Sequence, residues 1–186
     1  MELHPLTPDR WADLEALFGP QGATDGCWCM YWRLTAPEWK AGDGAGRKAA
    51  FKARVDAGPP PGILAYVEGK PVGWVQVTPR ADVPRYNRTR TAKPTDPDLE
   101  RTYALTCFFI HRSRRQSGLM TALIEAACAF AKARGAARVE AAPIEPKRPL
   151  MWGEGYVGIA SAFRAAGFEE IERRTPIRPF MRWTCE

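Results

Sequence analysis

The stretch of residues 103–135 constrains the fold of this chain more than any other part of the sequence. Residues 103–110, YALTCFFI, form an almost unbroken apolar run of strand length, which is typical of a central strand covered on both faces. The polar turn HRSRRQSG follows, and from Leu119 to Arg134 apolar residues recur at helical spacing until Gly135 ends the pattern. A strand, a turn and an amphipathic helix in this order indicate a sheet with helices packed on it.

The rest of the sequence adds strands and helices around this unit. With 186 residues, the chain is predicted to form one domain over residues 1–186. The predicted strands cover residues 1–7, 63–67, 72–78, 103–110, 138–142, 168–174 and 178–183. One predicted helix starts at Thr7. The other predicted helices cover residues 37–57 (delayed or broken by three glycines), 119–134 and 158–166. Residues 79–102 are predicted to be a long exposed loop. The fold class is therefore α/β (α+β), a mixed sheet with helices on both faces.

The chain is basic, with 27 Lys and Arg against 21 Asp and Glu and a formal net charge of +6. This excess has three interpretations: nucleic acid, an acidic small molecule, or ordinary solubility. The arginines of residues 80–101 lie in the predicted loop with one aromatic ring, Tyr86, which is too little for base stacking, so nucleic-acid binding is disfavoured. Arg112, Arg114 and Arg115 crowd a single turn instead, which favours a small anionic ligand.

The cysteines and the N-terminal residues are used to predict the cellular compartment of the protein. Five cysteines are an odd number, and Cys27 and Cys29 are one residue apart, which suits neither an easy disulfide nor a zinc knuckle. We predict free thiols and no metal site. Cys107 is predicted to pack as a small apolar residue, because His111 stands four residues further along the same strand, roughly 13 Å away, which is too far for a Cys–His nucleophile. The opening residues lack a signal-peptide pattern and no apolar run reaches roughly 18 residues, so we expect a cytoplasmic protein with no membrane partner.

The turn before the helix at residue 119 suits a phosphate. It brings Arg114, Arg115 and Gly118 to a helix N-terminus, where backbone N–H groups lack intrahelical partners and the helix dipole adds positive charge. A GxGxxG fingerprint and a GK[ST] motif are both absent from the sequence, which disfavours dinucleotides and nucleoside triphosphates.

Two blocks of the sequence resemble the GNAT superfamily of acetyl-CoA-dependent N-acyltransferases. The family's [RQ]-x-x-G-x-[GA] loop is similar to residues 115–120, RQSGLM, with Met120 in place of the usual Gly or Ala. Its A-x-x-[LF]-Y-x-x-x-G-F block is similar to residues 160–168, ASAFRAAGF, where Phe163 stands at the position that often holds tyrosine. The predicted order of elements also agrees with the family, so the resemblance covers nearly the whole chain.

The resemblance implies a fold and a cofactor, acetyl-CoA (coenzyme A). The family fold has a mostly antiparallel sheet of six to seven strands, about four helices, and a central strand pair that splays apart. The pantetheine arm would lie in this splay along Phe108, Phe109 and Ile110, with the pyrophosphate on the turn. The other cofactor-binding residues so implied are Arg114, Arg115, Gln116, Ser117, Gly118, Leu119, Met120, Thr121 and Phe163.

The resemblance also suggests catalytic groups. An amine with a reference pKa of about 10 must lose a proton before it attacks a thioester, so a base is needed, and the departing thiolate needs an acid. Glu140 matches the position of a glutamate base in some family members, and an edge-strand glutamate with no catalytic role is the equal alternative. Phe163 cannot donate a proton, so Tyr156 and Ser161 are the substitute acids.

The acceptor is predicted to bind near the unusual segment GCWCMYWR, residues 26–33. Aromatic walls could hold a cationic or planar acceptor, and packing between helices is the alternative role for some of these rings. Arg33 among aromatics could receive an acidic group. The predicted substrate-binding residues are Trp28, Tyr31, Trp32, Arg33 and Trp74.

Two functions remain in competition at this point. The first is an N-acetyltransferase that moves an acetyl group from acetyl-CoA to a primary amine of a small molecule, amino acid or peptide. The second is a catalytically silent module of the same fold that binds acyl-CoA or a partner, which Phe163 and Met120 would favour. The closing strands, with Arg178, Arg182 and Trp183, could pair across a homodimer.

Overall fold

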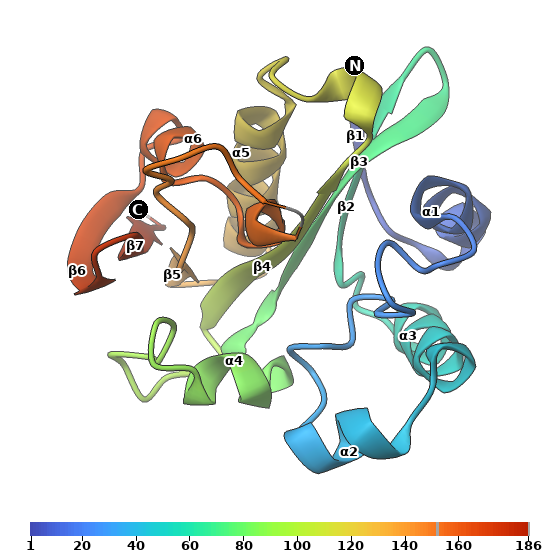
Figure 1. Cartoon of the computed structure of the whole chain (residues 1–186), viewed down its shortest axis with the longest axis horizontal. Coiled ribbons are helices and arrows are strands. Elements are labelled where there is room, and N and C mark those ends of the chain that lie inside the picture. The colour runs from blue at the N-terminus through green and yellow to red at the C-terminus, as the bar shows by residue number, and fades with distance from the viewer. Residues whose placement is uncertain (152, 186) are drawn as a thin grey trace.

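The computed structural model describes residues 1–151 and 153–185 and contains one seven-stranded sheet in the order β1-β2-β3-β4-β5-β7-β6 (Figure 1). Every neighbouring pair is antiparallel except β4 and β5, which are parallel. The predicted mixed, mostly antiparallel sheet is therefore confirmed. The strands are β1 (Glu2–Pro5), β2 (Gly62–Val67), β3 (Lys70–Pro79), β4 (Thr102–Ile110), β5 (Arg138–Ala141), β6 (Glu169–Thr175) and β7 (Arg178–Thr184).

Helices cover both faces of the sheet, as predicted, with α1 and α3 on one side and α5 and α6 on the other (Figure 1). The described part of the chain has six α-helices against about four expected, and the additional ones, α2 and α4, are short. Their bounds are α1 (Trp11–Phe18), α2 (Ala36–Ala41), α3 (Gly44–Ala57), α4 (Pro84–Arg88), α5 (Leu119–Lys132) and α6 (Ala160–Ala165).

Local sequence explains where several elements begin and end. The predicted helix of residues 37–57 is two helices, because Gly42 ends α2 and the Asp43 carboxylate accepts a hydrogen bond of 2.7 Å from the Gly46 N–H to start α3. The β2–β3 hairpin was predicted correctly. Its turn residues Glu68 and Gly69 have φ of 52° and 70°, as a two-residue type I′ turn requires.

The predicted exposed loop of residues 79–102 is wrong in part, because this segment contains α4 and contributes to the interior. Arg80, Val83, Tyr86 and Ala92 are all buried, and the last three pack with Phe180 of β7 in a separate apolar cluster. The segment has few apolar residues, but those few meet partners from distant strands. No local pattern of residues 79–102 reports such contacts, which is why the prediction failed.

The sheet opens between β4 and β5. These two strands pair only where Thr102, Tyr103 and Ala104 face β5, so the second half of β4 has no strand partner on that edge within the described chain. On its other edge, β4 pairs with β3 through a register shift at Gln76, where Thr106 and Cys107 oppose a single residue. Such a bulge bends a strand and redirects its side chains. The predicted splayed central pair is thus present.

No helix of residues 1–151 or 153–185 is both long and apolar enough to cross a membrane.

Candidate active site

The turn between β4 and α5 presents backbone N–H groups at the mouth of the opened sheet. Gln116 and Gly118 have φ of 59° and 79°, and the Ser117 hydroxyl donates a 2.6 Å hydrogen bond to the Arg114 carbonyl oxygen, which holds the turn closed. Gly118 is the N-cap of α5, and a Cβ there would meet no atom within 4 Å. The glycine is thus required by its φ, and the space in front of the helix N-terminus is open.

Within the described residues, the guanidinium groups of the arginines in this turn, Arg112, Arg114 and Arg115, form no ion pair. By contrast, Arg164 and Arg173 both pair with Glu145 and with Glu170 on the surface. Unpaired guanidinium groups beside a helix N-terminus provide charge and hydrogen-bond donors suited to a phosphate.

A cavity of about 690 Å³ extends from this turn along β4; we call it the β4–α5 cavity. It brings together most of the residues that the sequence assigned to the cofactor, and both candidate acids, Tyr156 and Ser161, also line it. Ser117 and Phe163 do not appear in its lining. The predicted cofactor residues that line it are Phe108, Phe109, Ile110, Arg114, Arg115, Gln116, Gly118, Leu119, Met120 and Thr121.

The two departures from the family pattern have structural roles. The Met120 sulfur accepts a hydrogen bond of 3.3 Å from the backbone N–H of Ile159, the N-cap of α6, so this side chain joins the two helices. Phe163 is fully buried and meets the rings of Phe108 and Phe168 edge-on, with centroids 5.8 and 4.9 Å apart. The structure therefore places Phe163 in the core, and its predicted contact with the cofactor is not supported.

A second cavity of about 420 Å³, the aromatic cavity, adjoins the first and shares Phe108, Phe109, Gly153 and Tyr156 with it. Its walls are mainly rings. Tyr156 comes from the 3₁₀ helix Glu154–Val157, which lies against β4 across the opening in the sheet. Of the described residues that line this cavity, the aromatic ones are Phe18, Tyr31, Trp32, Trp39, Trp74, Phe108, Phe109 and Tyr156.

Three of the five predicted acceptor residues, Tyr31, Trp32 and Trp74, line the aromatic cavity, and Trp28 and Arg33 do not. Trp28 is buried between α1 and the segment that follows it, with its ring 5.9 Å from Trp11. The Arg33 side chain is almost fully buried, donates a 3.2 Å hydrogen bond to Gln76 and lies 3.6 Å from the Asp82 carboxylate. Arg33 therefore has an acidic partner inside the protein and lies outside the lining of this cavity, which weakens the argument for an acidic substrate group, although its Nη2 atom has no hydrogen-bond partner among the described residues.

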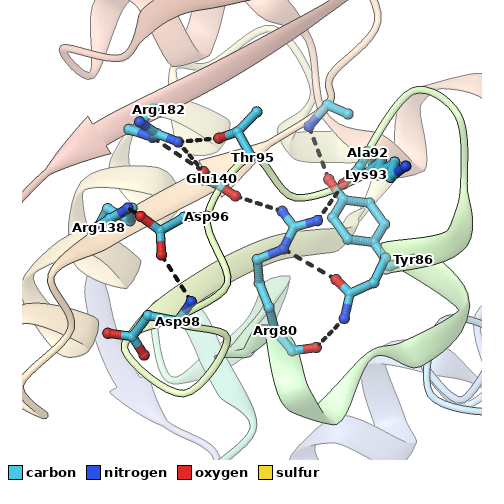
Figure 2. A network of polar contacts seen from close by, with 12 residues as sticks. Arg80, Tyr86, Ala92, Lys93, Thr95, Asp96, Asp98, Arg138, Glu140 and Arg182 are labelled. Atoms are coloured by element: carbon cyan, nitrogen blue, oxygen red, sulfur yellow. Dashed lines mark hydrogen bonds and ion pairs between the residues drawn. The ribbon is translucent and has the colours of Figure 1, made fainter.

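Glu140 lies in a buried ion-pair network (Figure 2) and is not among the residues that line either cavity. One carboxylate oxygen accepts a 2.8 Å hydrogen bond from Arg80, and the other accepts bonds of 3.1 and 2.7 Å from Arg182. Arg80 and Glu140 are both fully buried. A carboxylate that is held by two guanidinium groups and lines neither cavity is poorly placed to take a proton from an amine, so this geometry disfavours the predicted role as base.

Sequence reasoning missed residues in both cavities. Trp39 of α2 and the thiols of Cys27, Cys29 and Cys107 line the aromatic cavity. The segment after β5 adds Leu150, Met151, Gly155 and Ile159 to the β4–α5 cavity. The closely spaced glycines of GEGYVG, residues 153–158, were the available signal. A Cβ at Gly158 would stand 2.6 Å from the Phe163 ring, so this residue allows a close approach to the core.

The sequence matches the acetyltransferase (GNAT) family over residues 28–150, more than half of the chain. The chain therefore belongs to this family of acetyltransferases, and the enzyme class is acyltransferase. No curated protein matches the sequence closely enough to narrow the activity further.

Solved structures with the same fold extend over almost the whole chain. Ribosomal-protein-alanine N-acetyltransferase from Brucella melitensis is 17% identical, with 99% of each chain covered and a TM-score of 0.55. The yncA protein of Salmonella typhimurium, solved with acetyl-CoA, is 14% identical, with 100% of this chain and 94% of that chain covered and a TM-score of 0.56. AAC(6')-Ib, solved with paromomycin and acetyl-CoA, is 15% identical, with 98% and 92% covered and a TM-score of 0.56. At these identities the likeness establishes the fold.

Proposed function

We propose that this protein transfers an acetyl group from acetyl-CoA to the primary amine of a small molecule or peptide with an apolar, planar body. The observation that carries the proposal is the junction of two cavities of different chemistry at Tyr156. The β4–α5 cavity has phosphate-binding features at one end, and the aromatic cavity has ring-lined walls. Two reactants that enter from opposite sides would meet beside this tyrosine.

The β4–α5 cavity fits the donor. The N–H groups at the start of α5, together with Arg114 and Arg115, would hold the pyrophosphate. The backbone of Phe108 and Ile110, on the strand edge that β5 leaves unpaired, would hydrogen-bond the pantetheine amides. Acetyl-CoA supplies a thioester with an acyl carbon open to attack by a neutral amine.

The chain's own groups then handle the protons. We assign Tyr156 as the acid, because this residue lines both cavities and its phenol O–H can donate a proton to a thiolate. Ser161 lines the β4–α5 cavity alone, which makes it the less suitable acid. Asp25, which is exposed, is the one carboxylate among the described residues of the aromatic cavity, so we propose that the amine loses its proton to water or Asp25 at this rim.

The lining also bears on the acceptor. Polycationic amines such as aminoglycosides need several carboxylates to replace their solvation, and the described lining of the aromatic cavity offers only Asp25. A single amine on an aromatic or aliphatic body fits these walls better, because ring faces and edges contact apolar surfaces and a lone cation favourably.

The test is release of the CoA thiol from acetyl-CoA over a panel of amines, accompanied by calorimetric titration with CoA. We expect CoA binding, and the highest kcat/KM with arylalkyl amines. Faster turnover of an aminoglycoside than of any arylalkyl amine would show that the acceptor class is wrong. Binding of CoA with no turnover of any amine would favour the silent module.

A further inference from the structure

Three of the five cysteines converge on the aromatic cavity although they are far apart in the sequence. Cys27 and Cys29 lie between α1 and α2, and Cys107 lies in β4. All three line the same cavity, with Cys29 buried and the other two partly accessible. The chain's remaining cysteines, Cys128 and Cys185, lie by the α5 face of the sheet.

Cys29 and Cys107 line the same cavity and differ in chemical character. A side-chain hydrogen bond with Cys29 is the main cause that lowers the pKa of Cys107. The Thr106 side chain and the positive charge of Arg33 lower it further, against the effect of burial. Burial raises the pKa of Cys29 well above its usual range. The pair therefore joins Cys107, whose pKa is lowered, to Cys29, whose pKa is raised.

The backbone has unusual geometry at both cysteines. On β4, Thr106 and Cys107 form the bulge opposite Gln76, which redirects the Cys107 side chain. On the other side, Trp28 and Cys29 have φ of 46° and 57°, the left-handed region that bulky residues rarely adopt. The Cys29 sulfur also accepts a 3.1 Å hydrogen bond from the Trp74 indole N–H. Strained backbone of this kind is often found at functional positions.

Cys128 and Cys185 provide an internal contrast. Burial raises the pKa of both thiols. In the described residues no hydrogen bond joins these two sulfurs, and no arginine is among the groups that shift their pKa values. Cys185 is partly exposed like Cys107, and Lys132 lowers its pKa against the larger effect of burial. Reactivity of a cysteine follows its thiolate fraction and its access, so we expect Cys128 and Cys185 to react more slowly than Cys107 because their pKa values are raised and that of Cys107 is lowered.

We propose that Cys29 and Cys107 are a redox-active thiol pair that a peroxide converts into a disulfide across the aromatic cavity. The Cys107 thiolate attacks one peroxide oxygen, the O–O bond breaks, and Cys107 becomes a sulfenic acid while the other oxygen leaves as water after protonation. The Cys29 sulfur then attacks the sulfenic sulfur, the S–O bond breaks, and a second water leaves. The two thiols lose two electrons in total, the peroxide gains them, and a thiol reductant reverses the change.

The disulfide would alter the acceptor side of the protein and leave the donor side intact. It would fix the segment around residues 27–34 to β4 and remove the Cys29 thiol from its hydrogen bond with Cys107 inside the aromatic cavity. The β4–α5 cavity contains no cysteine in its described lining. If the proposed function holds, oxidation should therefore suppress acetylation of amines without weakening CoA binding.

The test is peptide mapping by mass spectrometry, without reduction, of the full-length protein after treatment with hydrogen peroxide. We expect a linked pair of peptides that contain Cys29 and Cys107, its loss in Cys29→Ser and in Cys107→Ser, and its persistence in the matched control Cys185→Ser. A linkage through Cys27, or oxidation of Cys128 and Cys185 at the same peroxide concentration, would overturn the assignment. Persistence of all five thiols in the reduced state would also overturn it.

A second measurement links the disulfide to the site. Peroxide should suppress amine acetylation in the wild-type protein and in Cys185→Ser, with recovery in dithiothreitol, while CoA affinity measured by calorimetry stays unchanged. Full activity of protein shown by mapping to be completely linked would refute the effect on the acceptor side. The mapping result does not depend on turnover, so failure of the proposed function and failure of the thiol pair are distinguishable.

Discussion

The two cavities that meet at Tyr156 are built in different ways. The β4–α5 cavity takes most of its predicted residues from one continuous stretch, residues 108–121, where a strand, a turn and a helix follow one another. The aromatic cavity collects residues from α1, the segment before α2, α2 itself, β3, β4 and the 3₁₀ helix Glu154–Val157. A site from one stretch can be recognised as a motif, whereas a site from six segments depends on how the whole chain packs.

This difference matches the chemistry of the two sides. A phosphate can be held by backbone N–H groups and arginines of one turn, because its recognition is electrostatic and local. An apolar acceptor needs walls on several sides, which no single turn provides. The proposed donor side can thus be predicted from one stretch of sequence, whereas the proposed acceptor side depends on how distant segments pack.

The largest effect is expected for Glu140, which lines neither cavity. Replacement by alanine would leave Arg80 buried without its carboxylate, and breaking such a pair costs about 3–5 kcal/mol of the free energy of unfolding. Chemical denaturation followed by circular dichroism measures this. The matched control is Glu169→Ala on the edge strand β6. Glu169 is exposed and forms no ion pair within the described residues, so this change should alter stability by about 0.5 kcal/mol or less. A pH–rate profile displaced in Glu140→Gln would restore Glu140 as the base.

The junction of the cavities is probed by Tyr156→Phe. Loss of a general acid should lower kcat by about 10²-fold. The affinities for CoA and for the acceptor should remain close to wild type, because the ring is kept. Ser161→Ala is the comparison, and we expect it to change kcat by less than Tyr156→Phe does. Equal losses in both variants would remove the assignment of Tyr156 as the main acid.

The donor side alone should respond to the double variant Arg114→Ala, Arg115→Ala. Loss of two charged contacts to a pyrophosphate should raise the Kd for CoA by about tenfold or more, or about 1.4 kcal/mol, with a weaker dependence on salt. Arg90→Ala, an exposed arginine outside both cavities, is the control and should leave the Kd unchanged. A rise in the acceptor KM without a change in CoA affinity would mean that the two cavities are assigned the wrong way round.

The smallest effect should come from the acceptor wall. Trp39 meets Tyr31 edge-on, with centroids 5.2 Å apart, and Trp39→Leu removes this ring contact while keeping an apolar side chain. We expect the acceptor KM to rise by an amount that corresponds to about 0.5–1.5 kcal/mol, with the Kd for CoA unchanged. Steady-state kinetics with a fixed saturating acetyl-CoA concentration measures this. An unchanged KM for every amine in the panel would place the acceptor elsewhere.

The sequence by itself determined the elements whose signals are local. The apolar run and helical spacing of residues 103–135 predicted β4 and α5, which the structure confirms, and the resemblance supplied the splayed sheet. The glycine and arginines of the turn predicted an anion site, which stays a prediction. Strand periodicity, helix capping and turn chemistry can be predicted in this way because they depend on residues within a few positions of one another.

Only the tertiary structure decided which residues meet across long separations. In the structure, residues 79–102 contribute to the interior, and Glu140 lies between two arginines. Trp28 and Arg33 lie outside the lining of the aromatic cavity, whereas Cys29 and Cys107 both line it. The physical reason is the same in each case. Burial and pairing of a charged, aromatic or thiol side chain depend on what packs against it, and that partner comes from a distant segment that local sequence cannot name.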